Sequence, residues 1–408
     1  MKNILRRVLV SPSLASSIRF TCTTTTTTTT SDEQLKPKTA ILMLNMGGPR
    51  NSEEVLGFLT NLFADRDIIR LPLQSKLGPW IAKRRTPSII EKYNEIGGGS
   101  PIYDWTTKQG DLMCKRLDEL CPESAPHKAY VGFRYAKPLA EEALEQLKAD
   151  GVEHVVAFSQ YPQYSCTTTG SSMNQIYRYY QQNHPLKTPV SWSVIDRWPT
   201  HPLLIKTFAQ NIKKELETFP EHIRSKVVLL FSAHSVPQYV MNRGDPYPAE
   251  VGATVQLVMQ ELGWCNPYRL VWQSKVGPLP WLEPGTENTI KAMVKKGQKN
   301  LMLIPIAFVN DHIETLHELD IEYAQDIGKE VGAERIARCA APNCDPTFIE
   351  CLADIVSTHL KTGETVKPQM LMTCPMCTEE TCKNAKMWWA KATGYLDSQQ
   401  KKAKAASS

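Results

Sequence analysis

Short apolar runs alternate along the chain with longer segments in which apolar residues recur at helical spacing. A buried strand is typically a short continuous apolar run, whereas a helix carries one apolar stripe. The runs that predict strands span residues 40–44, 130–133, 154–158, 226–231, 268–273 and 301–306. The segments that predict helices span residues 51–63, 139–148 and 287–296. This alternation predicts an α/β fold with parallel, doubly wound sheets.

The order of strands and helices occurs twice, so we expect two similar Rossmann-like halves with a cleft between them. Residues 37–200 form the first predicted half and residues 201–365 form the second. A helical extension is predicted over residues 366–408.

The first half contains a predicted insertion at about residues 66–87, which we call the lip. It carries the mostly apolar run 68–73, then Trp80 and Ile81. Its apolar part ends at the cations of 83–85. A large apolar group edged by cations is typical of a segment that dips into a membrane surface. An ordinary excursion packed against the fold explains the pattern equally well.

The net charge of +5 is concentrated at the N-terminus. Residues 1–31 hold Lys2, Arg6, Arg7 and Arg19 and no acidic residue, so the rest of the 408-residue chain is almost neutral. A neutral body excludes the broad basic face of a nucleic-acid-binding protein. The basic, Ser- and Thr-rich stretch predicts a mitochondrial transit peptide and linker over residues 1–36.

Two further function classes are disfavoured by the sequence. The chain has no apolar run near the ~18–20 residues that a transmembrane helix needs, so we expect no membrane span. The glycines at 47–48 and 97–99 do not form a dinucleotide or P-loop fingerprint. A dehydrogenase or a nucleotide hydrolase is therefore not expected.

The C-terminal region carries the most specific local motif, Cys374-Pro-Met-Cys377 followed by Cys382. Three thiols at this spacing predict a metal centre, either an iron–sulfur cluster or zinc, rather than three unrelated buried thiols. The fourth ligand is left open among four other cysteines: Cys166, Cys339, Cys344 and Cys351. Cys166 is favoured because it follows a predicted strand, where the sites of open α/β sheets gather.

Two histidines follow predicted strands in the second half. His234 comes after the strand at 226–231, and His312 comes after the strand at 301–306. A histidine at such a strand end can act as a general base, although a lone loop histidine is more often structural. Glu314, Glu318 and Glu322 recur every four residues, which on a helix gives a carboxylate column that relays protons or guides a cation, or a solvated acidic face.

Large flat or soft side chains and cations accompany these histidines near the predicted strand ends. Arg134 is a candidate to hold a ligand carboxylate by forked hydrogen bonds, as are the cations at 83–85. The flat or soft residues are Met46, Tyr93, Tyr135, Trp281 and Phe308. Together they suit a flat aromatic ligand that bears acidic groups.

Several motifs resemble the ferrochelatase family. The most specific is Leu229-Leu-Phe-Ser-Ala-His-Ser-Val-Pro237, continued by Asn242-Arg-Gly-Asp-Pro-Tyr247. The segments at 45–49, 98–101, 132–135, 161–165 and 308–314 match the family as well. The resemblance covers residues 38–390 and is to the mitochondrial type, which inserts Fe²⁺ into protoporphyrin IX to make protohaem.

The resemblance implies roles for individual residues. His234 would be the porphyrin-side base, with His312 and Glu314 close to it, and Asp311, Glu318 and Glu322 would form a proton or iron path. The expected porphyrin-binding residues are Met46, Arg84, Tyr93, Ser100, Arg134, Tyr135, Trp281 and Phe308. His201 and Asp354 match a proposed second acid–base or metal pair. Cys166, Cys374, Cys377 and Cys382 match the ligands of a [2Fe–2S] cluster.

The resemblance also implies a homodimer attached through the lip to the matrix face of the inner mitochondrial membrane. Two other functions compete with the chelatase. One is a non-catalytic iron–sulfur or haem carrier, in which the histidines and glutamates only bind product. The other is a related chelatase that inserts Co²⁺ into a different tetrapyrrole, which the three-cysteine motif and the leader argue against.

Overall fold

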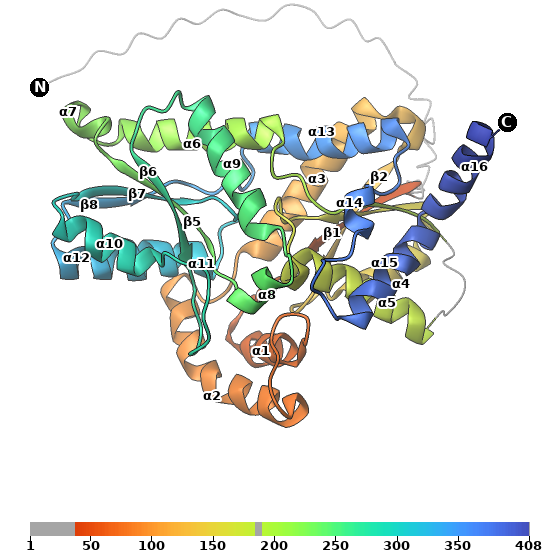
Figure 1. Ribbon diagram of the computed structural model, residues 1–408, viewed down its shortest axis with the longest axis horizontal. Helices are drawn as coiled ribbons and strands as arrows, with labels where there is room; N and C mark the ends of the chain where they lie inside the picture. The colour runs from red at the N-terminus through yellow and green to blue at the C-terminus, as the bar shows by residue number, and fades with distance from the viewer. Residues whose placement is uncertain (1–36, 184–189, 408) are drawn as a thin grey trace, which may run out of the picture. The chain divides into compact units, whose positions relative to one another are not determined.

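The computed structural model describes residues 37–183 and 190–407 (Figure 1). The predicted transit peptide and linker over residues 1–36 lie outside the described residues. The described residues belong to one compact unit.

The described strands form two four-stranded parallel sheets with the same strand order. Sheet A has the order β2-β1-β3-β4 and sheet B has the order β6-β5-β7-β8. The strand bounds are β1 Thr39–Asn45, β2 His127–Phe133, β3 His154–Ser159, β4 Ser191–Ile195, β5 Val228–His234, β6 Tyr268–Gln273, β7 Asn300–Pro305 and β8 Arg335–Arg338. The shared order confirms the predicted α/β class and the two similar halves.

Helices connect these strands and follow them at the C-terminus. The α-helices are α1 Val55–Ala64, α2 Gln74–Glu95, α3 Ile102–Leu120, α4 Ala140–Ala149, α5 Ser171–Asn183, α6 Pro202–Glu217, α7 Glu221–Arg224, α8 Gln238–Asn242, α9 Tyr247–Glu261, α10 Thr286–Lys295, α11 Ile313–Leu316, α12 Gly328–Val331, α13 Pro346–Thr362, α14 Pro368–Leu371, α15 Glu380–Ala392 and α16 Tyr395–Ser407. The other helices are the 3₁₀-helices η1 Ser52–Glu54 and η2 Pro122–Ser124 and the π-helices η3 Cys166–Gly170 and η4 Glu318–Ile327. The three helices predicted from spacing correspond to η1 with α1, α4 and α10.

The structure contains two strands that the pattern did not predict, and it shifts a third. β4 and β8 are edge strands of five and four residues, and their serines or arginines break the apolar run. β5 begins at Val228 and continues to His234, three residues beyond the predicted end. It continues because Ser232 and Ala233 are fully buried and pair with β6.

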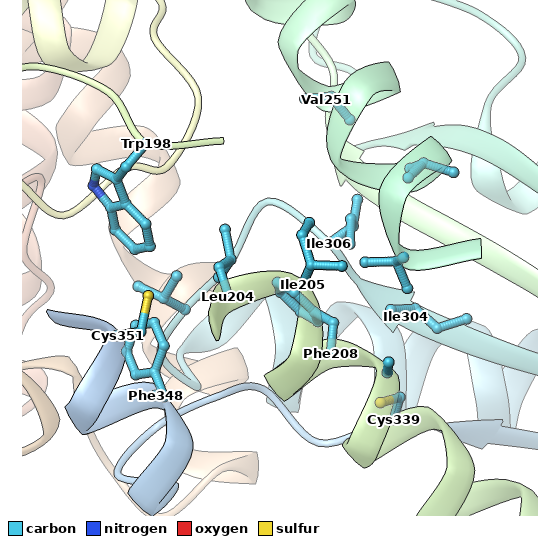
Figure 2. Packing of buried hydrophobic residues seen from close by; sticks show 14 of the residues in the cluster. Trp198, Leu204, Ile205, Phe208, Val251, Ile304, Ile306, Cys339, Phe348 and Cys351 are labelled. Carbon is cyan, nitrogen blue, oxygen red and sulfur yellow. The ribbon is translucent and has the colours of Figure 1, made fainter. Parts of the chain in front are cut away.

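One apolar core joins the two halves. Its buried side chains come from both sheets, from α6 and from α13. Figure 2 shows the part that contains Phe208 of α6, Ile304 of β7 and Phe348 of α13. Phe158 of sheet A, Phe231 of sheet B and Phe208 of α6 all belong to it. Because this core is continuous, the carboxyl ends of the two sheets are held in a defined relation.

The lip packs on one side and is exposed on the other. Ile69 and Ile81 pack on a small core that contains Phe63 and Tyr93. In contrast, Leu73 is 74% exposed and Trp80 is 58% exposed. The packing of Ile69 and Ile81 supports the interpretation of the lip as an ordinary packed excursion. The exposure of Leu73 and Trp80 is consistent with a membrane-interface segment.

The C-terminal extension packs on the first half. Trp389 of α15 is fully buried, and its ring lies edge-on to Trp192 of β4. Its indole Nε1 donates a hydrogen bond to the Met173 carbonyl of α5 at 3.3 Å. The extension therefore ends up beside the turn that carries Cys166. None of the described helices combines the length and apolarity needed to cross a bilayer.

Replacing Leu204 by Ala tests the shared core. Leu204 of α6 is fully buried in it, so the substitution removes apolar contacts and leaves a cavity. We expect a loss of about 2–5 kcal/mol in the free energy of unfolding, measured by urea denaturation. Leu112→Ala on α3, where the leucine is 39% exposed, is the matched control and costs less than about 1 kcal/mol. Equal losses for the two variants would contradict this description of the core.

Candidate active site

His234 and Glu314 face each other at the carboxyl end of sheet B. His234 is the last residue of β5, and Glu314 lies in the first turn of α11, after β7. The distance from His234 Nε2 to Glu314 Oε1 is 3.7 Å. His234 Nδ1 contacts the carbonyl oxygen of Ser235, which can only accept a hydrogen bond. The neutral ring therefore carries its proton on Nδ1 and presents the Nε2 lone pair, so His234 is set up to accept a proton.

His312 lies on the other side of the Glu314 carboxylate. Its Nε2 is 3.9 Å from Glu314 Oε2. Burial lowers the pKa of His312 to about 4, so this imidazole is neutral at neutral pH. Its Nδ1 is buried, without a hydrogen-bond partner among the described residues. Burial raises the pKa of Glu314, and the nearby His234 offsets part of that rise. Two imidazoles and one carboxylate thus converge in a site of low dielectric.

Aromatic side chains from both halves surround the group formed by His234, His312 and Glu314. The Trp281 ring centroid is 6.4 Å from that of His234, and the Phe308 centroid is 5.0 Å from that of His312. Burial and then the Glu314 charge raise the pKa of Tyr93, which comes from α2. The same two causes raise the pKa of Tyr161, which follows β3 and lies beside the Met46 backbone. Tyr93 and Tyr161 thus lie within electrostatic reach of Glu314. The porphyrin-binding roles of Tyr93 and Met46 stay predictions.

The carboxylate column lies on an unusual helix. The regular turn of α11 is followed by the π-helix η4, in which the His317 carbonyl accepts from both Ile321 N and Glu322 N. Spacing alone predicts a helix here but cannot distinguish an α-helix from a π-helix. Long π-helical segments are rare and occur mostly at functional sites.

The two outer carboxylates of the column are not simply solvated. Glu318 accepts hydrogen bonds from Ser274 N at 2.8 Å, from Gln273 Nε2 at 3.0 Å and from Tyr323 Oη at 2.7 Å. Glu322 is ion-paired with Lys92 of α2, and His317 Nδ1 lies 3.4 Å from it. The interpretation as a plain acidic face does not fit these contacts.

Arg134 already holds a carboxylate from its own chain. Its Nη2 lies 3.1 Å from Asp65 Oδ2, and Tyr135 Oη donates to the same oxygen at 2.6 Å. Arg134 therefore already has one carboxylate partner, and its role in binding an acidic group of a ligand stays a prediction. The sequence could not reveal this pair, because Asp65 lies far from Arg134 along the chain.

Three further predicted site residues, Arg84, Ser100 and Asp311, each contact a different part of the chain. Arg84 is exposed on α2, where its guanidinium lies 5.6 Å from the Trp80 ring centroid. Ser100 is buried, and its backbone N–H donates to the Pro49 carbonyl. The Asp311 carboxylate is ion-paired with Arg338 at 2.9 Å. The roles of Arg84, Ser100 and Asp311 stay predictions.

His201 and Asp354 form a second pair, which makes no hydrogen bond or ion pair with His234, His312 or Glu314. His201 Nε2 is 3.1 Å from Asp354 Oδ2, and Cys351 Sγ is 3.2 Å from His201 Nδ1. Cys351 belongs to α13 and lies near Phe348 and Trp198 in Figure 2. The acid–base or metal role of this pair stays a prediction.

The four predicted cluster ligands line one cavity of about 480 Å³, which we call the cysteine cavity. Its cysteines are Cys166, Cys374, Cys377 and Cys382. Of the four candidates for the fourth ligand, Cys166 lines this cavity, whereas Cys351 contacts His201. Among the described residues, no group of three or more His, Cys, Asp or Glu side chains is arranged for a single metal ion. Four thiols around a roomy cavity fit a multinuclear cluster better than one zinc ion.

Burial favours the neutral thiols of the cysteine cavity. Burial raises the pKa of the Cys382 thiol to about 11, and it raises the pKa of Cys166 still further. Thiolates are therefore unfavourable here unless a metal centre compensates their charge. The donor set and the space together fit an iron–sulfur cluster.

Comparison with known proteins identifies the family. The family model described as Ferrochelatase matches residues 38–360. The chain belongs to the ferrochelatase family. The enzyme class predicted from the sequence, a metal chelatase of the lyase class that inserts iron into a porphyrin, is thereby confirmed.

Curated relatives agree over most of the chain. The mitochondrial ferrochelatase of Drosophila melanogaster is 59% identical, over 87% of this chain and 92% of that protein. The mitochondrial ferrochelatase of Homo sapiens is 58% identical, over 88% of this chain and 84% of that protein. These mitochondrial relatives support the mitochondrial location predicted from the leader.

A solved structure of SirB from Bacillus subtilis with Fe³⁺ is 11% identical, with a TM-score of 0.46, over 80% of this chain and 98% of that chain. The fold assignment does not depend on it, because the two strand orders already establish the fold.

Sequence reasoning missed several residues that the structure places at the ferrochelatase site. Tyr161 and Tyr247 were quoted within motifs but not assigned to the site. Tyr247 Oη donates to the His234 carbonyl at 3.1 Å. Gln273 and Ser274, which bind Glu318, were predicted only as the end of a strand. Their position at the carboxyl end of a parallel strand was the signal that could have found them.

Glu314→Gln tests the burial of the Glu314 carboxylate through stability. Because the pKa of Glu314 is raised in the folded state, ionising it costs stability as pH rises above the ordinary value of about 4.5. The Gln variant avoids this cost, so its melting temperature should exceed that of the wild type by a few degrees at pH 7. The difference should vanish below about pH 4.5, where both states bind the proton.

Thermal melts from pH 4 to 8 measure the effect, with Glu217→Gln on the exposed face of α6 as the control. A constant difference across this range would show that burial of the Glu314 charge is not its cause.

Proposed function

We propose that His234 accepts the pyrrole protons while Fe²⁺ enters protoporphyrin IX, and that Glu314 receives each proton from it. The product is protohaem with release of two protons, the terminal step of haem synthesis. The observation that carries this assignment is the 3.7 Å approach of His234 Nε2, which bears the lone pair, to Glu314 Oε1.

Proton removal proceeds in two equal rounds. In each round a pyrrole N–H bond breaks, the proton moves to His234 Nε2, and the electron pair remains on the pyrrole nitrogen. The raised pKa of Glu314 makes it a better proton acceptor than an ordinary carboxylate. Glu318 and Glu322 continue the path along η4 toward Lys92, which is partly exposed to solvent.

Metal delivery uses the same group of side chains. The carboxylate and imidazole ligands Glu314 and His312 bind Fe²⁺ well enough to replace its water but not so tightly as to retain it. Neutral His312 keeps a lone pair available because its pKa is about 4. The rings of Trp281, Phe308 and Tyr93 form the walls that hold the macrocycle in a bent geometry.

We also propose that Cys166, Cys374, Cys377 and Cys382 hold a [2Fe–2S] cluster, supported by their shared cavity. When bound, the cluster cross-links the C-terminal loop to the turn η3 through iron–thiolate bonds. This loop already contacts the second half, because Met376 N donates to the Arg243 carbonyl at 3.2 Å.

The lip supports a peripheral membrane contact. Leu73 and Trp80 are strongly exposed, and the cations at 83–85 follow them along α2. This pairing of apolar and cationic groups favours an anionic bilayer surface. We propose the matrix face of the inner mitochondrial membrane as that surface and a homodimer as the assembly, both carried by the family resemblance.

His234→Ala tests the catalytic assignment. Loss of the base should lower the rate of haem formation by about 100-fold or more while porphyrin binding persists. The assay mixes the anaerobic protein with protoporphyrin IX and Fe²⁺ and follows haem absorbance and the loss of porphyrin fluorescence. His222→Ala, an exposed histidine of α7, is the control. Undiminished haem formation in the His234 variant would favour the carrier hypothesis.

Cys374→Ser tests the cluster. The purified variant should lose the visible charge-transfer absorbance of an iron–sulfur centre and most of its bound iron and sulfide. Cys265→Ser replaces an exposed cysteine outside the cavity and should retain both. Zinc in the wild-type protein, without labile sulfide, would replace the cluster proposal by the zinc alternative.

Trp80→Glu tests the membrane contact. An exposed apolar ring on the lip becomes a carboxylate that an anionic bilayer repels, so binding to cardiolipin-containing vesicles should fall several-fold. The control is Trp264→Glu, since Trp264 is 49% exposed outside the lip. Cosedimentation measures both variants, and equal binding by them would contradict a role for the lip.

A further inference from the structure

A buried carboxylate lies at the point where the lip leaves α1. Asp65 is the residue after α1, and its side chain is 1% exposed. Its Oδ2 accepts hydrogen bonds from Tyr135 Oη at 2.6 Å and from Ser171 Oγ at 2.5 Å. The Arg134 guanidinium lies 3.1 Å from the same oxygen, and Asp67 N donates to Oδ1 at 2.9 Å. Four donors thus surround one carboxylate.

These contacts keep the Asp65 carboxylate ionised. Burial alone raises the pKa of Asp65, but the Arg134 charge and the hydrogen bonds together hold it below its usual value. The Arg134 guanidinium is itself mostly buried, with 13% of its side chain exposed. One negative and one positive charge therefore cancel inside the wall of the first half, whereas a single unpaired charge there would create a strong local field.

The Asp65–Arg134 pair is attached directly to the segment formed by Asn45 and Met46, which we call the Met46 wall. Arg134 N donates to the Asn45 carbonyl at 2.8 Å, and Tyr135 N donates to the Met46 carbonyl at 3.0 Å. Tyr161 lies beside the Met46 backbone and responds to the Glu314 charge, so the wall and the acidic group face the same space. A charge left unpaired at Arg134 would therefore act on anything that approaches Glu314.

We propose that Asp65 is a positioning residue that neutralises Arg134 and thereby keeps the Met46 wall free of net charge while Fe²⁺ approaches Glu314. Asp65 also holds Tyr135 by its hydroxyl, so it fixes the geometry of the wall as well as its charge. This inference rests on the proposed function, in which Glu314 and His312 bind Fe²⁺.

The experiment measures KM separately for Fe²⁺ and for protoporphyrin IX in the full-length protein, at low and high salt. Asp65→Asn keeps the shape but leaves the Arg134 cation unpaired. We expect the KM for Fe²⁺ to rise about tenfold at low salt, because a cation repels a divalent cation, and to rise less at high salt. The KM for the porphyrin should not rise, since the porphyrin carries carboxylates.

The complementary variants make the charge argument specific. Arg134→Gln leaves the Asp65 anion unpaired, so the KM for Fe²⁺ should fall below the wild-type value. The double variant Asp65→Asn with Arg134→Gln removes both charges and should return the KM for Fe²⁺ close to the wild type. Because it buries no unpaired charge, this double variant keeps the test open if Asp65→Asn does not fold.

Asp150→Asn is the matched control. Asp150 also accepts hydrogen bonds from a tyrosine and a cation, with Tyr130 Oη at 2.5 Å and Lys128 Nζ at 2.6 Å. It lies at the end of α4, outside the candidate site, and its KM values should equal those of the wild type.

The outcomes separate the two levels of the argument. If the wild-type protein forms no haem, the proposed function fails. If the wild type is active but Asp65→Asn raises both KM values equally, or the double variant does not restore the KM for Fe²⁺, only the charge-neutralising role of Asp65 is overturned.

Discussion

The site depends on the parallel register between β5 and β7. Ser232 of β5 pairs with Pro305 of β7, so the two strands reach the edge of sheet B side by side. β5 then continues to His234, and the chain after β7 turns back into α11, which carries Glu314. A slip in this register would separate the imidazole from the carboxylate, since each residue advances a strand by about 3.3 Å.

Burial assigns different tasks to chemically similar groups. Asp65 is a fully buried carboxylate that is paired with Arg134, whereas the mostly buried Glu314 has two imidazoles beside it and no Arg or Lys ion-pair partner among the described residues. The pKa of Asp65 is consequently lowered and that of Glu314 is raised. The first carboxylate can therefore act as a fixed charge, and the second binds a proton more readily than an ordinary carboxylate does.

Packing of aromatic residues places the cysteine cavity. Trp389 of α15 is buried against Trp192, and it bonds to Met173 of α5. This anchors the helix that carries Cys382 beside the helix that follows Cys166. The thiols of Cys374, Cys377 and Cys382 thus line one cavity with that of the distant Cys166. The contact between Trp389 and Trp192 that places them involves none of the cysteines.

The sequence by itself determined the features that depend on local periodicity and spacing. It predicted the α/β class, six of the eight strands that the structure describes, and the strand ends that carry His234 and His312. It also indicated a thiol site from Cys374, Cys377 and Cys382. Only the tertiary structure decided that Arg134 is paired with Asp65, that Cys166 joins the other three cysteines, and that the acidic column lies on a π-helix. Tyr135 and Asp65 meet across 70 positions of chain. Such contacts are decided by how buried polar groups find partners during packing, and no local pattern in the sequence records them.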